Sequence, residues 1–121
     1  MSLNVIEKKS FQFSIDIVHL YKKLCEERRE YVLSKQFLKS GTSIGANVKE
    51  ALSGQSKRDF LSKMNIALKE ANETEYWIEL LISTGYINKE NPILCKCKEL
   101  CKILNSIVKT TKNNCELLIV N

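Results

Sequence analysis

The chain has 121 residues, of which 44% are hydrophobic and only one is proline. This length predicts one domain, residues 1–121, with a single core, and no apolar run is long enough to span a membrane. The first ten residues lack the apolar segment of a secretion signal, and five irregularly spaced cysteines do not match a disulfide framework, so we expect a cytoplasmic location. The formal charge of +5 favours an anionic partner without identifying one.

The first helix is predicted from about Phe11 to Arg28, after a short N-terminal arm of residues 1–9. Its apolar residues recur along one face at the helical period, as packing against a core requires. These residues are Phe13, Ile17, Leu20, Tyr21 and Leu24. His19 projects from the polar side of the same helix.

The second helix is predicted from Ser34, as its N-cap, to Ser53–Gly54. Gly41 and Gly45 lie four residues apart and therefore share a face of this helix. A glycine inside a helix costs up to about 1 kcal/mol relative to alanine. The pair therefore predicts that a neighbouring helix approaches closely at this face.

The stretch Gly41-Thr42-Ser43-Ile44-Gly45 also spells G-x-S-x-G, the pattern of a hydrolase nucleophile elbow. That elbow needs a strand before the serine, a helix after it and a histidine later in the chain. No strand is predicted before Ser43, and the one histidine of the chain, His19, precedes it. We expect no catalytic residue here and no enzymatic activity.

Ser56 and Asp59 have the spacing of a capping box and predict the start of a third helix, which ends near Gly85. Its main apolar stripe follows the helical period. The stripe consists of Phe60, Met64, Ala67, Leu68, Ala71, Ile78 and Ile82.

Glu75 falls at the centre of this stripe, where a buried carboxylate needs a partner. Asn47, Ser43 or a basic side chain of the second helix could supply it. No companion acid, histidine or metal ligand accompanies Glu75, so we expect a polar contact that fixes the register of the helices rather than a general base.

A second apolar ridge on the third helix consists of Ile66, Trp77 and Leu80. A helix that is apolar on both sides must bury both, so the ridge predicts an interface with another subunit. The alternative is a wide core that wraps around Trp77.

Asn91 and Pro92 predict the N-cap and first turn of a fourth helix, and residues 113–121 form a C-terminal tail. The inward residues of this helix are Ile93, Cys97, Leu100, Cys101, Leu104, Ile107, Val108 and Thr111. Its cysteines lack the C-x2-C spacing of structural zinc sites, so we expect core thiols, with no metal and no cofactor. Four amphipathic helices joined by short turns predict an all-α, antiparallel up-down-up-down four-helix bundle.

Lysines line one flank of the fourth helix and the outer side of the second helix. They are Lys98, Lys102, Lys109 and Lys112 on the fourth helix, with Lys35 and Lys39 on the second. We predict that they bind the phosphates of nucleic acid; the alternative is a solvated face that only aids solubility. No aromatic residues interleave them, so weak sequence preference is expected.

Two runs of the chain, SKQFLKSGTSIGANVKEA and SKRDFLSKMNIALKEANETEYWIELL, resemble one family. It comprises the four-helix-bundle proteins encoded by intervening sequences of bacterial 23S rRNA genes, and the resemblance covers residues 10 to 110. The matching positions are Ser43, Ile44, Ala46, Asn47, Glu50, Ser56, Asp59, Phe60, Ala67, Glu70, Glu73 and Trp77. Many relatives have proline where this chain has Gly45.

The resemblance implies a bundle that assembles as a ring-shaped homopentamer and has no established enzymatic activity. A related bundle, the accessory variability determinant of diversity-generating retroelements, is a basic pentamer that binds nucleic acid and a reverse transcriptase. Together with the lysines, this favours a non-enzymatic ring that binds nucleic acid, foremost RNA. The alternative function is a protein–protein scaffold, such as an accessory subunit for a nucleic-acid enzyme, with no nucleic-acid binding of its own.

Overall fold

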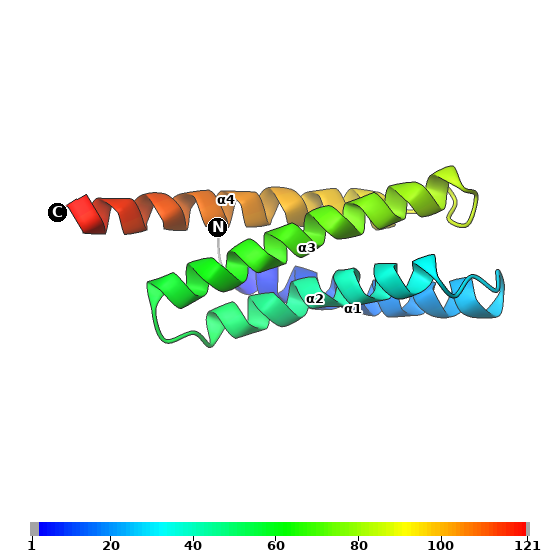
Figure 1. Ribbon diagram of the computed structural model, residues 1–121, viewed down its shortest axis with the longest axis horizontal. Helices are drawn as coiled ribbons and strands as arrows, with labels where there is room; N and C mark the ends of the chain where they lie inside the picture. Colours follow the sequence, from blue (N-terminus) through cyan, green and yellow to red (C-terminus); the bar gives the residue numbers. More distant parts are fainter. Residues whose placement is uncertain (1–2, 121) are drawn as a thin grey trace.

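The structure, a computed structural model, describes the backbone of residues 3–120 and the side chains of residues 3–114. It contains four helices, α1 (Leu3–Glu26), α2 (Leu33–Leu52), α3 (Lys57–Ser83) and α4 (Ile93–Val120). Successive helices run in opposite directions (Figure 1), and residues 3–120 contain no strand. The predicted four-helix bundle is confirmed. No helix in this part of the chain has an apolar stretch that could cross a membrane.

Each helix packs against its neighbours in the chain, and α1 also packs against α4. Within the described chain, α1 shares no contacts with α3, and α2 shares none with α4. These two pairs therefore occupy opposite corners of the bundle. The core between the four helices contains fully buried side chains from each of them, among them Phe13, Phe37, Met64 and Leu100.

The predicted N-terminal arm is wrong, because α1 begins at Leu3 rather than near Phe11. Ile6 is completely buried and Ser10 is 1% exposed, so both extend the inward face of α1 by two turns. The tail predicted from residue 113 also continues the helix, since α4 runs to Val120. Its last turns project beyond the rest of the bundle (Figure 1).

The start of α2 differs from its prediction in one chemical detail. Ser34 is not the N-cap; the carboxylate of Glu30 accepts hydrogen bonds from the backbone N–H groups of Val32, Leu33 and Ser34 at 3.3, 3.0 and 2.7 Å. The Ser34 hydroxyl instead donates to the carbonyl of Glu30 at 2.7 Å. A buried acid from the preceding turn thus satisfies the free N–H groups of the helix start.

The predicted starts of α3 and α4 are confirmed. The Ser56 hydroxyl accepts a hydrogen bond from the Asp59 N–H at 3.1 Å. The Asn91 side chain likewise accepts from the Ile93 N–H at 2.9 Å. Gly85, just after α3, has a φ of +84°, a conformation that glycine adopts without steric cost.

The close approach predicted at Gly41 and Gly45 occurs between α2 and α1. A Cβ atom added at Gly41 would lie 2.8 Å from the side chain of Ile17. At Gly45 it would lie 3.2 Å from the carbonyl oxygen of Ser10 and from the hydroxyl of Ser14. Small residues on both helices therefore let the two backbones come together, and the dispersion contacts offset the poor helix propensity of glycine.

Two expectations about buried polar groups need correction. Thr74, not Glu75, is the completely buried polar residue on the inner face of α3, and its hydroxyl donates to the Glu70 carbonyl at 2.7 Å. Glu75 is half-buried on the side that meets α4, where it accepts a hydrogen bond from the Cys101 thiol at 3.7 Å. Asn47 instead donates to the Ser43 carbonyl of its own helix at 2.8 Å.

Candidate nucleic-acid interface

The outer face of α4 carries a row of exposed lysines. Lys98, Lys102, Lys109 and Lys112 are all exposed and are spaced by four, seven and three residues, so they follow one face of the helix. At 1.5 Å per residue the row is about 21 Å long. The opposite face of α4 is held in the core by Cys97, Leu100 and Leu104, so the helix cannot rotate its lysines away from solvent.

The charged groups of this row are not held in ion pairs. Among the side chains that the structure describes, no ion pair involves any of these four lysines. Over its full length, from residue 93 to 120, the helix contains five lysines and two glutamates, a net charge of 5 − 2 = +3, compared with +5 for the whole chain. The positive charge of the protein is therefore concentrated on one helix, as expected for a surface that attracts phosphate groups. We refer to the four residues as the α4 lysine row.

Lys35 and Lys39, predicted to join this surface, lie elsewhere. Both are exposed on α2, at the corner of the bundle opposite α4, so the structure does not bring them together with the α4 lysine row. Lys39 lies near Glu70 of α3, whose pKa is raised by burial and by the neighbouring charge of Glu73 and is lowered in part by Lys69 and Lys39. Lys39 thus lies close to an acidic residue of α3 and not to the α4 lysine row.

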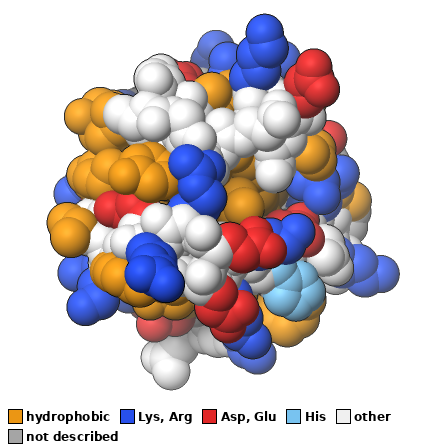
Figure 2. Space-filling model, turned by 90° about the vertical axis from the view of Figure 1, so that its right-hand side faces the viewer, with side chains coloured by type: hydrophobic (Ala, Val, Ile, Leu, Met, Phe, Trp, Pro, Cys, Tyr) orange, Lys and Arg blue, Asp and Glu red, His pale blue; other side chains and the backbone are white. Residues whose placement is uncertain are grey.

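The turns at one end of the bundle do not extend the basic surface. Figure 2 shows this end, where the turn between α1 and α2 and the turn between α3 and α4 lie, and basic and acidic side chains are interspersed over it. Arg28 of the first turn is engaged, since its guanidinium donates to the carbonyls of Gly85 and Tyr86 at 2.9 and 3.2 Å and stacks over the Tyr86 ring. Its role is to join the two turns.

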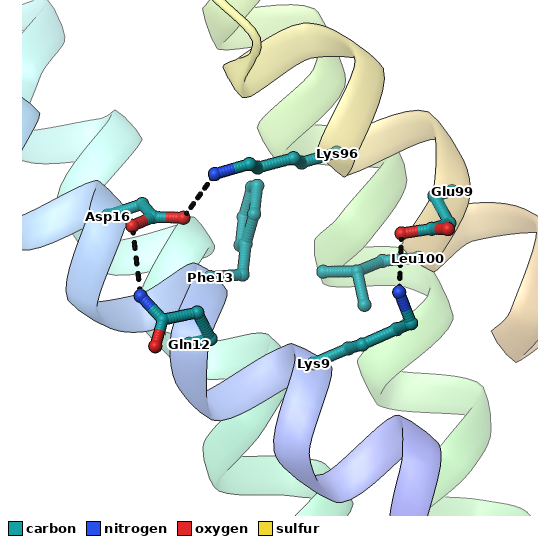
Figure 3. A pocket seen from close by; sticks show the side chains of 7 residues that line it. All are labelled: Lys9, Gln12, Phe13, Asp16, Lys96, Glu99 and Leu100. Atoms are coloured by element: carbon teal, nitrogen blue, oxygen red, sulfur yellow. Dashed lines mark hydrogen bonds and ion pairs between the residues drawn. The ribbon is translucent and has the colours of Figure 1, made fainter.

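The groove between α1 and α4 contains a small hollow of about 130 Å³ (Figure 3). Phe13 and Leu100 form its apolar floor, and two ion pairs cross it, Lys9–Glu99 at 3.1 Å and Lys96–Asp16 at 3.0 Å. Three of the four side chains are exposed and Asp16 is partly buried, so each pair contributes little stability. The hollow is smaller than a typical ligand pocket of about 300 Å³ or more. We therefore interpret it as a gap between two packed helices and not as a ligand-binding pocket.

Cys97 and Cys101 of α4 pack toward the core as predicted, whereas Cys95 is exposed. Cys97 is completely buried and its thiol donates to the Ala71 carbonyl at 3.4 Å. Hydrogen bonding with Cys101 and burial raise the pKa of Cys97 far above its usual range, so it stays protonated and inert. No group of three potential ligands that could hold a metal ion occurs among the described residues.

The predicted interface residues on α3 are exposed to different degrees. Ile66 is 37% exposed, whereas Trp77 and Leu80 are half-buried and Trp77 also packs against the core. The Trp77 indole lies 3.4 Å from the Glu73 carboxylate as a donor and meets the exposed ring of Tyr76 edge-on. The packing of Trp77 against the core fits the alternative of a wide core. The interface with another subunit stays a prediction.

Comparison with known proteins agrees with this architecture. The family of 23S rRNA-intervening sequence proteins matches residues 2–106. The chain belongs to this family. The crystal structure of a protein of unknown function from the S23 ribosomal protein family of Bacteroides thetaiotaomicron VPI-5482 is similar to this family member, with a TM-score of 0.87 and 56% sequence identity. The similarity covers 90% of this chain and 99% of that one, and the comparison with curated proteins gives no significant match.

Proposed function

We propose that this family member is a non-enzymatic nucleic-acid-binding protein that acts as an assembly of several copies. The α4 lysine row carries the proposal, because it places four exposed positive charges, none of them in an ion pair with the described side chains, along about 21 Å of a rigid helix. Lysines on such a helix neutralise phosphates and release counterions without reading base edges.

RNA is the ligand that we favour. The family description names 23S rRNA, and the similar crystal structure is assigned to a ribosomal protein family. From residue 93 to 114, α4 contains no aromatic residue on which unpaired bases could stack. We therefore expect the row to contact the sugar–phosphate backbone with little sequence preference.

Assembly strengthens this binding. In the ring of five copies that the family resemblance implies, five chains of +5 carry a total of +25. Several weak phosphate contacts on one assembly act together, so the affinity of the ring exceeds that of one copy.

The proposal predicts a steep dependence of RNA affinity on salt. Each phosphate contact contributes about −0.7 to −0.9 to the slope of log affinity against log salt concentration. Changing Lys98, Lys102, Lys109 and Lys112 together to glutamine should reduce the magnitude of that slope by about 3 for each copy that contacts the RNA. Fluorescence anisotropy with a labelled RNA, at a series of salt concentrations, measures the slope.

A matched control keeps the change in total charge the same. The variant with Lys23, Lys49, Lys57 and Lys89 changed to glutamine also loses four exposed lysines, and these lie off the outer face of α4. It should bind RNA nearly as well as the wild type. Equal losses in both variants would show that only net charge matters, and no binding by the wild type at low salt would remove the proposal.

The second candidate function is the protein–protein scaffold. The exposed apolar side chains Phe11, Val32 and Tyr76, which are 68%, 74% and 58% exposed, favour it. If the wild type and both lysine variants fail to bind RNA at low salt, this function is preferred and the α4 lysine row only keeps the protein soluble.

The absence of catalysis at Ser43 can be tested directly. The Ser43 hydroxyl donates to the Lys39 carbonyl of its own helix at 2.6 Å, and no histidine follows it in the chain. A fluorophosphonate probe, which labels activated serines, should therefore leave Ser43 unmodified, as shown by peptide mass spectrometry. Stoichiometric labelling of Ser43 but not of Ser62, an exposed serine of α3, would contradict this expectation.

A further inference from the structure

The outer face of α1 carries an apolar stripe that the core does not use. Phe11, Ile15 and Val18 follow each other at intervals of four and three residues, which places them on one face of the helix. Phe11 is 68% exposed, and none of the three belongs to the buried core or to the side chains packed against it. Lys8 and Lys22, both exposed, lie at the two ends of the stripe.

The outer face of α3 carries a second stripe, formed by Ile66, Glu73, Tyr76, Trp77 and Leu80. It differs from the α1 stripe in charge. From residue 69 to 80, α3 contains one lysine and four glutamates, a net charge of 1 − 4 = −3. Glu73 lies within the stripe itself, beside the indole of Trp77.

The two stripes differ in position, and the α1 stripe matches the α3 stripe in length only when its flanking lysines are counted. The distance from Lys8 to Lys22 and the distance from Ile66 to Leu80 each correspond to 14 residues, or about 21 Å along the helix axis. Because α1 and α3 occupy opposite corners of the bundle and share no contacts in the described chain, one copy cannot pair its own stripes. A second copy can.

We propose that the α1 stripe of one copy packs against the α3 stripe of the next. The apolar side chains of both helices then leave water, and Lys8 and Lys22 meet an acidic partner. The contact joins two different surfaces, so it is heterologous, and repeated contacts close into a ring when the rotation between copies permits. The α4 lysine row lies outside both stripes and remains free. This inference rests on the self-association in the proposed function and identifies the two faces that make it.

Two variants, each with one stripe disrupted, provide the test. Phe11→Asp places a charge in the α1 stripe, and Tyr76→Asp places one in the α3 stripe; both side chains are more than half exposed, so the fold should persist. Each variant alone should lose its oligomer and give a mass of 13.9 kDa by light scattering. Mixed together, they should form a 1:1 dimer and nothing larger, because the mixture retains one intact α1 stripe and one intact α3 stripe for each pair of chains.

The control is Val32→Asp, which makes the same kind of change at an exposed apolar residue outside both stripes. It should keep the mass of the wild type, and circular dichroism should show unchanged helix content in all three variants. A monomeric wild type would overturn the self-association in the proposed function together with this inference. A wild-type oligomer that survives both stripe variants, or variants that stay monomeric when mixed, would overturn the pairing of α1 with α3 alone.

Charge reversal at exposed residues provides a second pair of variants that tests the same contact. Lys8→Glu combined with Lys22→Glu should weaken association at least tenfold, and so should Glu73→Lys in a separate chain. An equimolar mixture should recover association, because each reversed stripe then meets a partner of opposite charge. Failure of the mixture to exceed either variant alone would show that these charges do not face each other.

Discussion

Replacing Gly41 with leucine should lower the free energy of unfolding by about 3 kcal/mol, the upper part of the range for overpacked cores. Even a single added carbon would lie 2.8 Å from the side chain of Ile17, and a leucine adds three more. Ile17 is completely buried and branched at Cβ, so it cannot rotate away without disturbing its own contacts. The two helices must separate, and the contact between α1 and α2 loosens along its length.

Chemical denaturation followed by circular dichroism, at a fixed protein concentration, measures this loss. Ala46→Leu is the matched control, because Ala46 is exposed on the same helix and a leucine there has good helix propensity. That control should change the free energy of unfolding by less than about 0.5 kcal/mol. Equal stability of Gly41→Leu and Ala46→Leu would mean that α1 and α2 are not packed as closely as the structure places them.

The four helices could be predicted because local signals and burial agree along most of the chain. Ser56 and Asn91 are good capping residues, and each is followed by apolar residues at the helical period. The first two turns of α1 were missed for the opposite reason. Ile6 stands among charged residues, and Ser10, although buried, is polar, so no stripe is visible there.

Other details depend on how the helices cross. A helix that meets two neighbours has a wide inner face, and the sequence pattern alone could not decide between Thr74 and Glu75 as its buried polar residue. Thr74 can be buried because its short side chain satisfies its hydroxyl within its own helix, whereas Glu75 needs a partner and finds Cys101 on α4.

The candidate site was predictable only within one helix. The spacing of the α4 lysine row requires the four side chains to share a face whatever the tertiary structure. Their relation to Lys35 and Lys39 depends on which helices are neighbours, and the diagonal placement of α2 and α4 separates them. Phe11, Ile15 and Val18 of the α1 stripe can be found in the sequence by their helical spacing. Three such residues indicate an exposed apolar stripe only once the opposite face of α1 is known to fill the core.

Replacing Glu30 with alanine should lower the free energy of unfolding by about 2 kcal/mol at pH 7, within the range for helix caps and charged hydrogen bonds. The substitution leaves the backbone N–H groups of Val32, Leu33 and Ser34 without their acceptor at the start of α2. Exposed Glu27 in the same turn is the matched control, and Glu27→Ala should change stability by less than about 0.5 kcal/mol. Thermal and chemical unfolding of both variants at equal concentration make the comparison.

The contribution of Glu30 should also disappear in acid, and the direction follows from its pKa. Burial acts to raise the pKa of Glu30, but the hydrogen bonds from Leu33, Ser34 and Val32 outweigh burial and lower it. A carboxyl group whose pKa is lower in the folded protein stabilises the fold above its ordinary pKa of about 4.3, and this stabilisation is lost as the pH falls through the folded value. The gap in stability between the wild type and Glu30→Ala should therefore be constant from pH 7 to about pH 5 and narrow toward pH 3. A gap that stays constant down to pH 3, measured by urea denaturation at each pH, would show that the charge of Glu30 does not hold the start of α2.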